Sequence, residues 1–351
     1  MHSVSTSQVS VHIEDYSPRD GDHLCSLWTD PVTDRAVGTR FLAGGDAAER
    51  GLWILDSSRD GECGIPADFA AGSGPFIRYS TDRVHVEGGR FDPDRMRGFW
   101  SSRAAETAPS GAKHLRAVAE MAWALRALPG TDQAPAFESS LNPHLHSLPL
   151  SVICQYGSTK FSAEILLAMI LSHPLVVIGD RVMTNPFSID HEHFPERFAA
   201  LRGDSQAALV PMWSHFLHEL PSTTEVATFL CNSLPTLIGA ERVWVTLHGM
   251  PEPLMLEVAT DRVTATDLEP VRRLTLDRRG RLYGLWPGSE RIAGGAVQFG
   301  MIEGLGVLES TYYRDTGRII VTRTDAFARP ELARFATIAS EVARAMVGTL
   351  N

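Results

Sequence analysis

The sequence predicts a two-domain protein: a doubly wound α/β domain with a mostly parallel sheet, followed by a smaller α+β domain. Three observations predict this architecture. The chain has 351 residues, more than one hydrophobic core usually supports. Before residue 190, short apolar segments without alternation are separated by helix-compatible stretches, which is typical of parallel strands covered on both faces. After residue 240, strand-like segments follow one another directly.

Six apolar segments are predicted to be the strands of the first domain: 24–28, 51–56, 76–79, 115–121, 151–156 and 175–178. Four stretches between them are predicted to be helices: 31–42, 93–105, 134–145 and 161–172. In the last of these, Ile165, Met169 and Ile170 recur at helical spacing, and Pro174 ends the helix. A strand follows at once, so this part is one αβ unit of a parallel sheet.

The pattern fades between residues 186 and 203, and we place the domain boundary near residue 204. The sequence therefore predicts a first domain at 1–203, a helical connector at 204–222 and a second domain at 223–351. The second domain is expected to contain helices at 224–238 and 330–347, and strands at 242–248, 254–258, 297–302, 306–313 and 319–322.

Composition argues against several classes of function. The 32 basic and 42 acidic residues give a formal charge of −10, which opposes a nucleic-acid-binding surface. The two lysines, Lys113 and Lys160, stand outside any phosphate-binding loop, and no Gly-x-Ser-x-Gly motif occurs. The four cysteines show no metal-binding or redox spacing. We therefore expect no cofactor and no catalytic nucleophile.

The first eleven residues lack the basic and apolar regions of a signal peptide, and no run of about 18 apolar residues occurs. The sequence therefore predicts a cytoplasmic protein with reduced thiols that does not enter a membrane.

Five short motifs occur in a characteristic order in the first domain. They are Gly21-Asp22-His23 before a strand, Gly89-Arg90-Phe91-Asp92-Pro93 before a helix, Leu115 to Trp123, Phe137-Glu138 with Leu141-Asn142, and Cys154-Gln155-Tyr156 with Phe161, His173-Pro174 and Asn185-Pro186. In order and spacing, residues 12–190 resemble the MEDS family, the methanogen and methylotroph sensory domains. That family is itself similar to degenerate RecA- or KaiC-type ATPases, which implies a RecA-like sheet without a phosphate-binding loop.

Two features depart from the family pattern: the stretch 61–74 is glycine-rich where an amphipathic helix is usual, and Gly157 stands where an acidic residue is usual. The second domain resembles a GAF sensor module, because a glycine-containing strand, Gly306 to Glu309, precedes a terminal helix.

Open parallel sheets bind ligands beyond the carboxyl ends of their strands, where strand order reverses. The sequence predicts a small-molecule cleft near Trp28, Glu120 and Tyr156. The full set of candidate ligand-binding residues is Asp22, His23, Trp28, Arg116, Glu120, Trp123, Tyr156 and His173. Structural roles compete with these predictions: Glu120 could pair with Arg116 or Arg126, His23 could be a hydrogen-bonded core residue, and His173 could serve only to end a helix.

Metal binding is considered for His191 and His193, which lie beside Asp190 and Glu192. No recognised metal-binding motif surrounds them, and we predict no specific metal site there. Cys25 and Cys154 lie on predicted buried strands, where a thiol behaves as a small hydrophobic group.

These observations favour a non-catalytic signalling protein that senses a small molecule and modulates a partner regulator in a transcriptional, kinase or sigma-factor pathway, with a homodimer as one assembly. One alternative is a divergent nucleotide-dependent hydrolase or transferase with Glu120 and Asp56 as metal carboxylates. The other is a scaffold that binds proteins and no small molecule.

Overall fold

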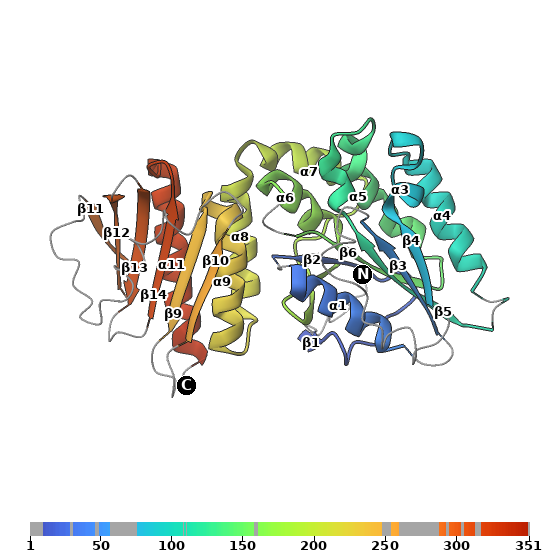
Figure 1. Ribbon diagram of the computed structural model, residues 1–351, viewed down its shortest axis with the longest axis horizontal. Helices are drawn as coiled ribbons and strands as arrows, with labels where there is room; N and C mark the ends of the chain where they lie inside the picture. Colours follow the sequence, from blue (N-terminus) through green and yellow to red (C-terminus); the bar gives the residue numbers. More distant parts are fainter. Residues whose placement is uncertain are drawn as a thin grey trace, which may run out of the picture. The chain divides into compact units, whose positions relative to one another are not determined.

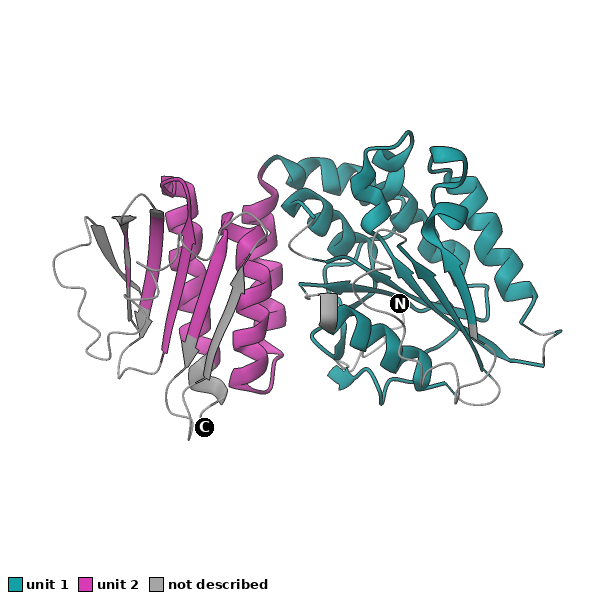
Figure 2. Cartoon of the chain, in the orientation of Figure 1, with its two compact units in different colours: residues 1–203 teal, residues 204–351 magenta. Residues whose placement is uncertain are grey.

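The computed structural model describes residues 10–28, 31–45, 49–56, 76–107, 109, 111–157, 161–247, 254–259, 288–292, 295–302, 305–312 and 317–349. The chain folds into two compact units, Met1–Gly203 and Asp204–Asn351 (Figure 2). Within the described residues, no helix has both the length and the apolar character needed to cross a membrane.

The first unit is built on an eight-stranded sheet with the order β1-β8-β7-β2-β6-β5-β3-β4. The six strands from β7 to β4 run parallel, and β8 and β1 extend one edge antiparallel. The strands are β1 (Ser10–His12), β2 (His23–Leu27), β3 (Glu49–Leu55), β4 (Phe76–Ser80), β5 (His114–Glu120), β6 (Leu150–Gln155), β7 (Leu175–Ile178) and β8 (Arg181–Thr184). Strand β2 is central, and its partners β6 and β7 come from much later in the chain.

Helices cover both faces of this sheet. Helix α1 (Pro31–Ala43) lies on one face, and α4 (Pro93–Ala105), α5 (Ala134–Leu145) and α6 (Ala163–Ser172) lie on the other (Figure 1). Helix α4 starts sharply because the Asp92 side chain accepts the N–H groups of Asp94 and Arg95 and proline occupies the first turn. The chain leaves β2 toward β3 and leaves β6 toward β7, so strand order reverses between β2 and β6.

The two faces of β2 and β6 differ in chemistry because successive side chains point to opposite sides. On the α1 face, Leu24 and Ile153 pack with Val37, Phe41 and Trp53 in an apolar core. On the face covered by α5 and α6, the same two strands present polar and thiol side chains. The second face therefore holds the unusual part of the core.

The second unit has a six-stranded antiparallel sheet with the order β10-β9-β14-β13-β12-β11. The strands are β9 (Arg242–Leu247), β10 (Leu254–Ala259), β11 (Gly288–Ile292), β12 (Gly295–Ile302), β13 (Leu305–Tyr312) and β14 (Gly317–Arg323). Helices α9 (Thr223–Ile238) and α11 (Arg329–Thr349) pack on the sheet, and α8 (Ser205–His218) packs on both helices. Trp213 of α8 stacks on Phe229 and donates to the Ser233 hydroxyl at 2.7 Å.

A mixed α/β architecture with a large, mostly parallel sheet is confirmed. The strands and helices predicted for the first domain occur within a few residues of the expected positions. Three strands, β1, β8 and β11, and helix α7 (Phe194–Leu201) were not predicted; the three strands have only three to five residues each. The helix predicted as a connector is α8. The glycine-rich stretch 61–74 lies outside the described residues.

Candidate functional site

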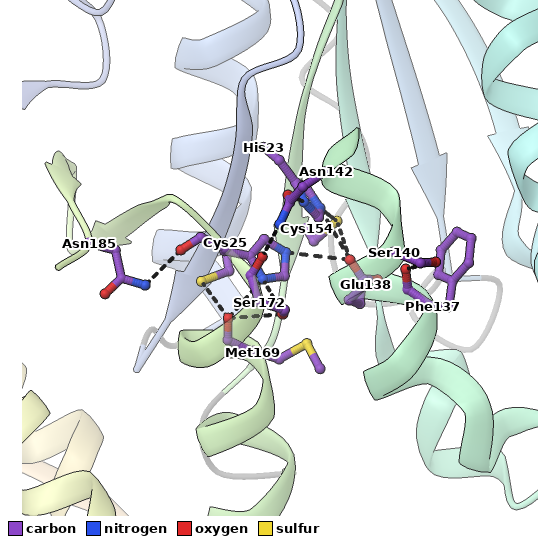
Figure 3. Close-up of polar contacts among 11 residues, drawn as sticks. His23, Cys25, Phe137, Glu138, Ser140, Asn142, Cys154, Met169, Ser172 and Asn185 are labelled. Carbon is purple, nitrogen blue, oxygen red and sulfur yellow. Dashed lines mark hydrogen bonds and ion pairs between the residues drawn. The ribbon is translucent and has the colours of Figure 1, made fainter. Parts of the chain in front are cut away.

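A polar cluster lies in the core of the first unit, between the sheet and helices α5 and α6 (Figure 3). It consists of His23, Glu138, Cys154 and His173, each at most 2% exposed. One ligand-type atom from each side chain lies within 4.8 Å of all the others. This is the only such group of four among the described histidine, cysteine and acidic residues.

Glu138 is the centre of the cluster. Its Oε2 lies 3.1 Å from Nε2 of His23, 3.4 Å from Nε2 of His173 and 3.7 Å from Sγ of Cys154. The Cys154 Sγ is also 3.6 Å from Nε2 of His23. Two imidazoles, a thiol and a carboxylate therefore converge on one small volume.

Each member comes from a different secondary-structure element. His23 opens β2 and Cys154 lies near the end of β6, on strands paired so that Cys25 lies opposite Cys154. Glu138 lies in the first half of α5, and His173 is the residue that caps the C-terminus of α6. Pro174 prevents that helix from continuing, which fixes the position of the His173 backbone.

A second layer of hydrogen bonds orients both imidazoles. Nδ1 of His23 lies 2.7 Å from the amide oxygen of Asn142, whose nitrogen donates to the Ser172 carbonyl at 2.5 Å. Nδ1 of His173 lies 2.8 Å from the Met169 carbonyl. Because both partners are acceptors, each Nδ1 carries a proton, and a neutral ring then directs an unprotonated Nε2 at the cluster.

Burial dominates the electrostatics of the cluster. It lowers the pKa of His173 to about 4, together with the charge of His23 and against that of Glu138. Burial, followed by the nearby Glu138 charge, raises the pKa of the Cys154 thiol well above its usual value.

Tyr156 adds an aromatic wall to the cluster. Its ring packs edge-on against His173 at 6.2 Å and against Phe161 at 5.3 Å between centroids. The hydroxyl is buried near Glu138 and makes no hydrogen bond of ordinary geometry to a described residue. Burial and the Glu138 charge raise the pKa of Tyr156 well above its usual value.

The structure brings together three of the eight predicted ligand-binding residues, His23, Tyr156 and His173. Glu120 lies on the opposite face: it pairs with Gln155, whose side chain donates to the Asp34 carbonyl of α1. Tyr156, the residue after β6, turns its ring to the other side, toward His173, so the sheet separates it from Glu120.

Arg116 and Asp22 have local partners. Nε of Arg116 donates to Glu49 at 2.7 Å, and its guanidinium lies over the Phe41 ring. Asp22 accepts the hydroxyl of Tyr16 and the N–H of Arg19 in the loop before β2.

Trp28 and Trp123 are both fully buried. Trp28 follows β2 with φ of 51°, a left-handed conformation. Trp123 stacks on Phe91 at 4.4 Å and on His85 at 5.0 Å.

At the carboxyl end of β5, the Glu120 side chain accepts the N–H of Asp56 at 2.9 Å. The Asp56 carboxylate in turn receives Arg126 at 2.5 Å. Of the two arginines predicted as partners of Glu120, Arg126 pairs with Asp56 and Asp82, and Arg116 pairs with Glu49.

The histidines considered as metal ligands lie elsewhere. His191 and His193 are exposed in the turn before α7 and are not members of the cluster. Glu138 and Cys154 were not predicted as site residues, although both belong to the ordered motifs. The signal that could have found Glu138 is that it is the single carboxylate of its helix and stands between the apolar residues Phe137 and Leu141.

Comparisons with known proteins bear on the first unit. Residues 22–174 match the family model described as MEDS, the MEthanogen/methylotroph, DcmR Sensory domain. All four cluster residues fall inside this match, so the predicted resemblance is confirmed for that part of the chain.

No curated protein matches the chain. Among solved structures, the phycoerythrobilin-bound GAF domain from a cyanobacterial phytochrome is similar at 12% identity and a TM-score of 0.26. That match covers 41% of this chain and 95% of that domain.

Proposed function

We propose that this chain, whose first unit contains a MEDS sensory domain over residues 22–174, is a non-catalytic signalling protein. Its first unit senses a small molecule, and the bound state changes the contact of the protein with a partner regulator in a transcriptional, kinase or sigma-factor pathway. The observation that carries this proposal is the match to a sensory family. A ligand acts in this way only if it binds two conformations or assemblies with different affinity.

The ligand site is proposed at the carboxyl ends of β2 and β6, where strand order reverses. The two ends are adjacent, because Tyr156 donates its N–H to the Ser26 carbonyl at 3.0 Å. The left-handed backbone of Trp28 supports this location, since such strain costs about 1–3 kcal/mol and gathers at functional sites. Tyr156 links this edge of the sheet to the buried cluster through its contact with His173.

The contacts of the two acidic residues at the end of β5 support a sensor over a hydrolase. Glu120 and Asp56 are both buried, and Asp56 is already paired with Arg126. A carboxylate neutralised by an internal arginine is poorly suited to hold Mg²⁺ for phosphoryl transfer. On this proposal the first unit has a RecA-like sheet that lacks a phosphate-binding loop.

The second unit is proposed to be the GAF-like part of the protein, supported by a six-stranded antiparallel sheet with α9 and α11 packed on it. A cytoplasmic location and a homodimer belong to the same proposal. Sedimentation of the full chain, with and without a ligand identified by thermal-shift screening, would measure dimer formation.

A thermal-shift screen of the full chain tests the proposal, with nucleotides, metal salts and small organic molecules as probes. A selective ligand raises the melting temperature by mass action. Calorimetry on the strongest ligand then compares wild type with Tyr156→Ala, Glu120→Ala and the control Glu196→Ala on the exposed surface of α7.

We expect Tyr156→Ala to weaken binding at least tenfold, and Glu196→Ala to leave the affinity unchanged. Turnover of a magnesium nucleotide that Glu120→Ala abolishes would replace the sensor by the hydrolase alternative. Unchanged affinity in Tyr156→Ala would remove the proposed ligand site.

A further inference from the structure

We propose that His23, Glu138, Cys154 and His173 together bind one divalent transition-metal ion, with Zn²⁺ as the best chemical match. The proposal concerns what the core of the first unit holds, and it stands whether or not that unit senses a small molecule. It rests on the spacing of the four donor atoms, the orientation of the two imidazoles and the charge balance of a closed site.

The spacing of the donor atoms fits a tetrahedral ion. With metal–ligand bonds of about 2.0–2.3 Å, the donor atoms of a tetrahedral zinc site lie roughly 3.3–3.5 Å apart. Four of the six separations between the donor atoms are 3.1, 3.4, 3.6 and 3.7 Å, and all six are at most 4.8 Å. These four separations are within a few tenths of an ångström of tetrahedral values, so small side-chain shifts bring the four donors around one ion.

The orientation of the imidazoles is that of metal ligands. Metal-bound histidines almost always donate their second N–H to a carbonyl, amide or carboxylate oxygen, which fixes the tautomer. Here Nδ1 of His23 donates to Asn142 and Nδ1 of His173 donates to the Met169 carbonyl. The Asn142 amide is itself held by the Ser172 carbonyl, so its oxygen stays turned toward His23.

Without a cation, this arrangement leaves buried groups poorly matched. Nε2 of His173 is fully buried, has no hydrogen bond to a described residue and points at the Glu138 carboxylate. Two nitrogen lone pairs directed at a buried carboxylate repel it, and burying such a charge without a counter-ion is costly. A positive ion placed between these atoms turns each repulsive contact into a coordinate bond.

Charge balance favours a divalent ion. Binding of Zn²⁺ would displace the thiol proton of Cys154 to solvent and form a zinc–thiolate bond. One thiolate, one carboxylate, two neutral imidazoles and Zn²⁺ then sum to zero. A neutral site of this kind can stay in a core where all four residues are at most 2% exposed.

The donor set also selects the kind of metal. Ca²⁺ and Mg²⁺ prefer six or more oxygen ligands, whereas thiolate and imidazole together select zinc and its neighbours in the first transition row. Four protein ligands from β2, α5, β6 and α6 complete a tetrahedron and leave no open position. The geometry therefore points to a closed site that holds the sheet and two helices together.

Metal analysis of the full-length protein is the first test. The protein is purified without chelators, equilibrated with Zn²⁺, desalted and analysed for zinc per chain. We expect about one zinc per chain in wild type, and a tenfold or greater loss in Cys154→Ser and Glu138→Gln.

Cys25→Ser is the matched control. Cys25 lies on the same face of the neighbouring strand and is equally buried, but its thiol donates to the Met169 carbonyl and is not one of the four proposed ligands. We expect this variant to keep its zinc. The double variant His191→Ala/His193→Ala, which changes the exposed histidines, is also expected to keep it.

Cobalt(II) provides a measurement on the wild-type fold alone, which keeps the proposal falsifiable if the core variants unfold. A site with one thiolate gives a sulfur-to-cobalt charge-transfer band together with the intense visible bands of a tetrahedral ion, and Zn²⁺ should abolish both. Wild-type protein that holds less than a tenth of an equivalent of zinc after loading would overturn the proposal. So would loss of zinc in the exposed His191/His193 variant, or an octahedral cobalt spectrum.

Discussion

The imidazole rings of His23 and His173 lie 4.0 Å apart between centroids, tilted by 41°, and both direct Nε2 at the same oxygen of Glu138. One ring belongs to the first parallel strand of the sheet and the other to the end of α6. The hydrogen bonds that Nδ1 of each ring donates, to Asn142 and to the Met169 carbonyl, therefore help to set the geometry of the cluster.

Asn142 is expected to act as a positioning residue for His23. Replacement by alanine removes the acceptor for Nδ1, and loss of such outer partners typically weakens metal binding about 10–100-fold. We expect Asn142→Ala to lower zinc affinity within this range, measured by competition with a chromophoric chelator.

Asn142→Asp keeps an acceptor oxygen and is expected to retain most of the affinity. Ser140→Ala is the control on the same helix, because its hydroxyl bonds to the Phe137 carbonyl and to Arg97 instead. Equal affinities for Asn142→Ala and Ser140→Ala would show that Asn142 does not position His23.

His85 is expected to make the first unit less stable in mild acid. Burial lowers the pKa of His85 to about 3. The charges of Glu138 and Asp56 act to raise this pKa, and those of Arg95 and Arg126 act to lower it. In the unfolded chain the His85 imidazole binds a proton near pH 6.5, whereas in the folded chain it stays neutral down to about pH 3. The stability of the first unit therefore falls as the pH drops from about 6.5 toward 3.

This single group should cost about 2 kcal/mol at pH 5 relative to pH 8. Native-state hydrogen exchange of the first unit at the two pH values measures the effect, after correction for intrinsic exchange. His85→Phe, which keeps an aromatic ring against Trp123, should reduce the difference by that amount, whereas the exposed His193→Gln should not. An unchanged pH dependence in His85→Phe would contradict the assignment.

Gly130 is expected to tolerate no side chain. Its φ is +86°, and an added Cβ would lie 2.4 Å from the Phe91 carbonyl oxygen. Since that atom belongs to the backbone, Gly130→Ala combines left-handed strain with a steric clash, and we expect destabilisation of at least about 3 kcal/mol.

Gly88→Ala is the matched comparison for Gly130→Ala. Gly88 also has a positive φ, of +69°, but open space surrounds its added Cβ. Strain alone should cost about 1–2 kcal/mol there. Urea unfolding of the full chain, followed in the transition of the first unit, distinguishes the two; similar costs would mean that the Phe91 contact relaxes freely.

Arg323 is expected to stabilise the second unit through its planar guanidinium. It donates to both oxygens of Glu331 at 2.8 and 2.7 Å and lies over the Phe327 ring at 4.3 Å. Glu331 also accepts the Ala328 N–H at the start of α11, so the pair joins β14 to that helix.

Lysine cannot reproduce the bidentate contact, and we expect Arg323→Lys to cost about 1–2 kcal/mol. Hydrogen exchange in α11 should report this loss. Arg344→Lys changes a mostly exposed pair with Glu341 and should alter protection by less than about 0.5 kcal/mol. Equal effects of the two variants would show that the fork geometry contributes nothing.

The sequence predicted most elements of both units because their apolar runs and caps are local signals. It did not predict the cluster as a set, although His23 and His173 were both candidates. Bringing Glu138 and Cys154 to them depends on which strands pair and on how α5 and α6 lie, and these are tertiary relationships. The sequence also did not show that Glu120 and Tyr156 face opposite sides of the sheet, because this depends on the register of β5 and β6.

The central position of β2 has a consequence for how the protein is made. This strand leaves the ribosome long before both of its neighbours, because β6 and β7 begin only at Leu150 and Leu175. At about 5–20 residues per second, β2 waits roughly 6–25 s for its first partner. During synthesis β2 therefore has no neighbouring strand, and His23 is present before His173. We expect chaperone binding and early misfolding to involve this segment.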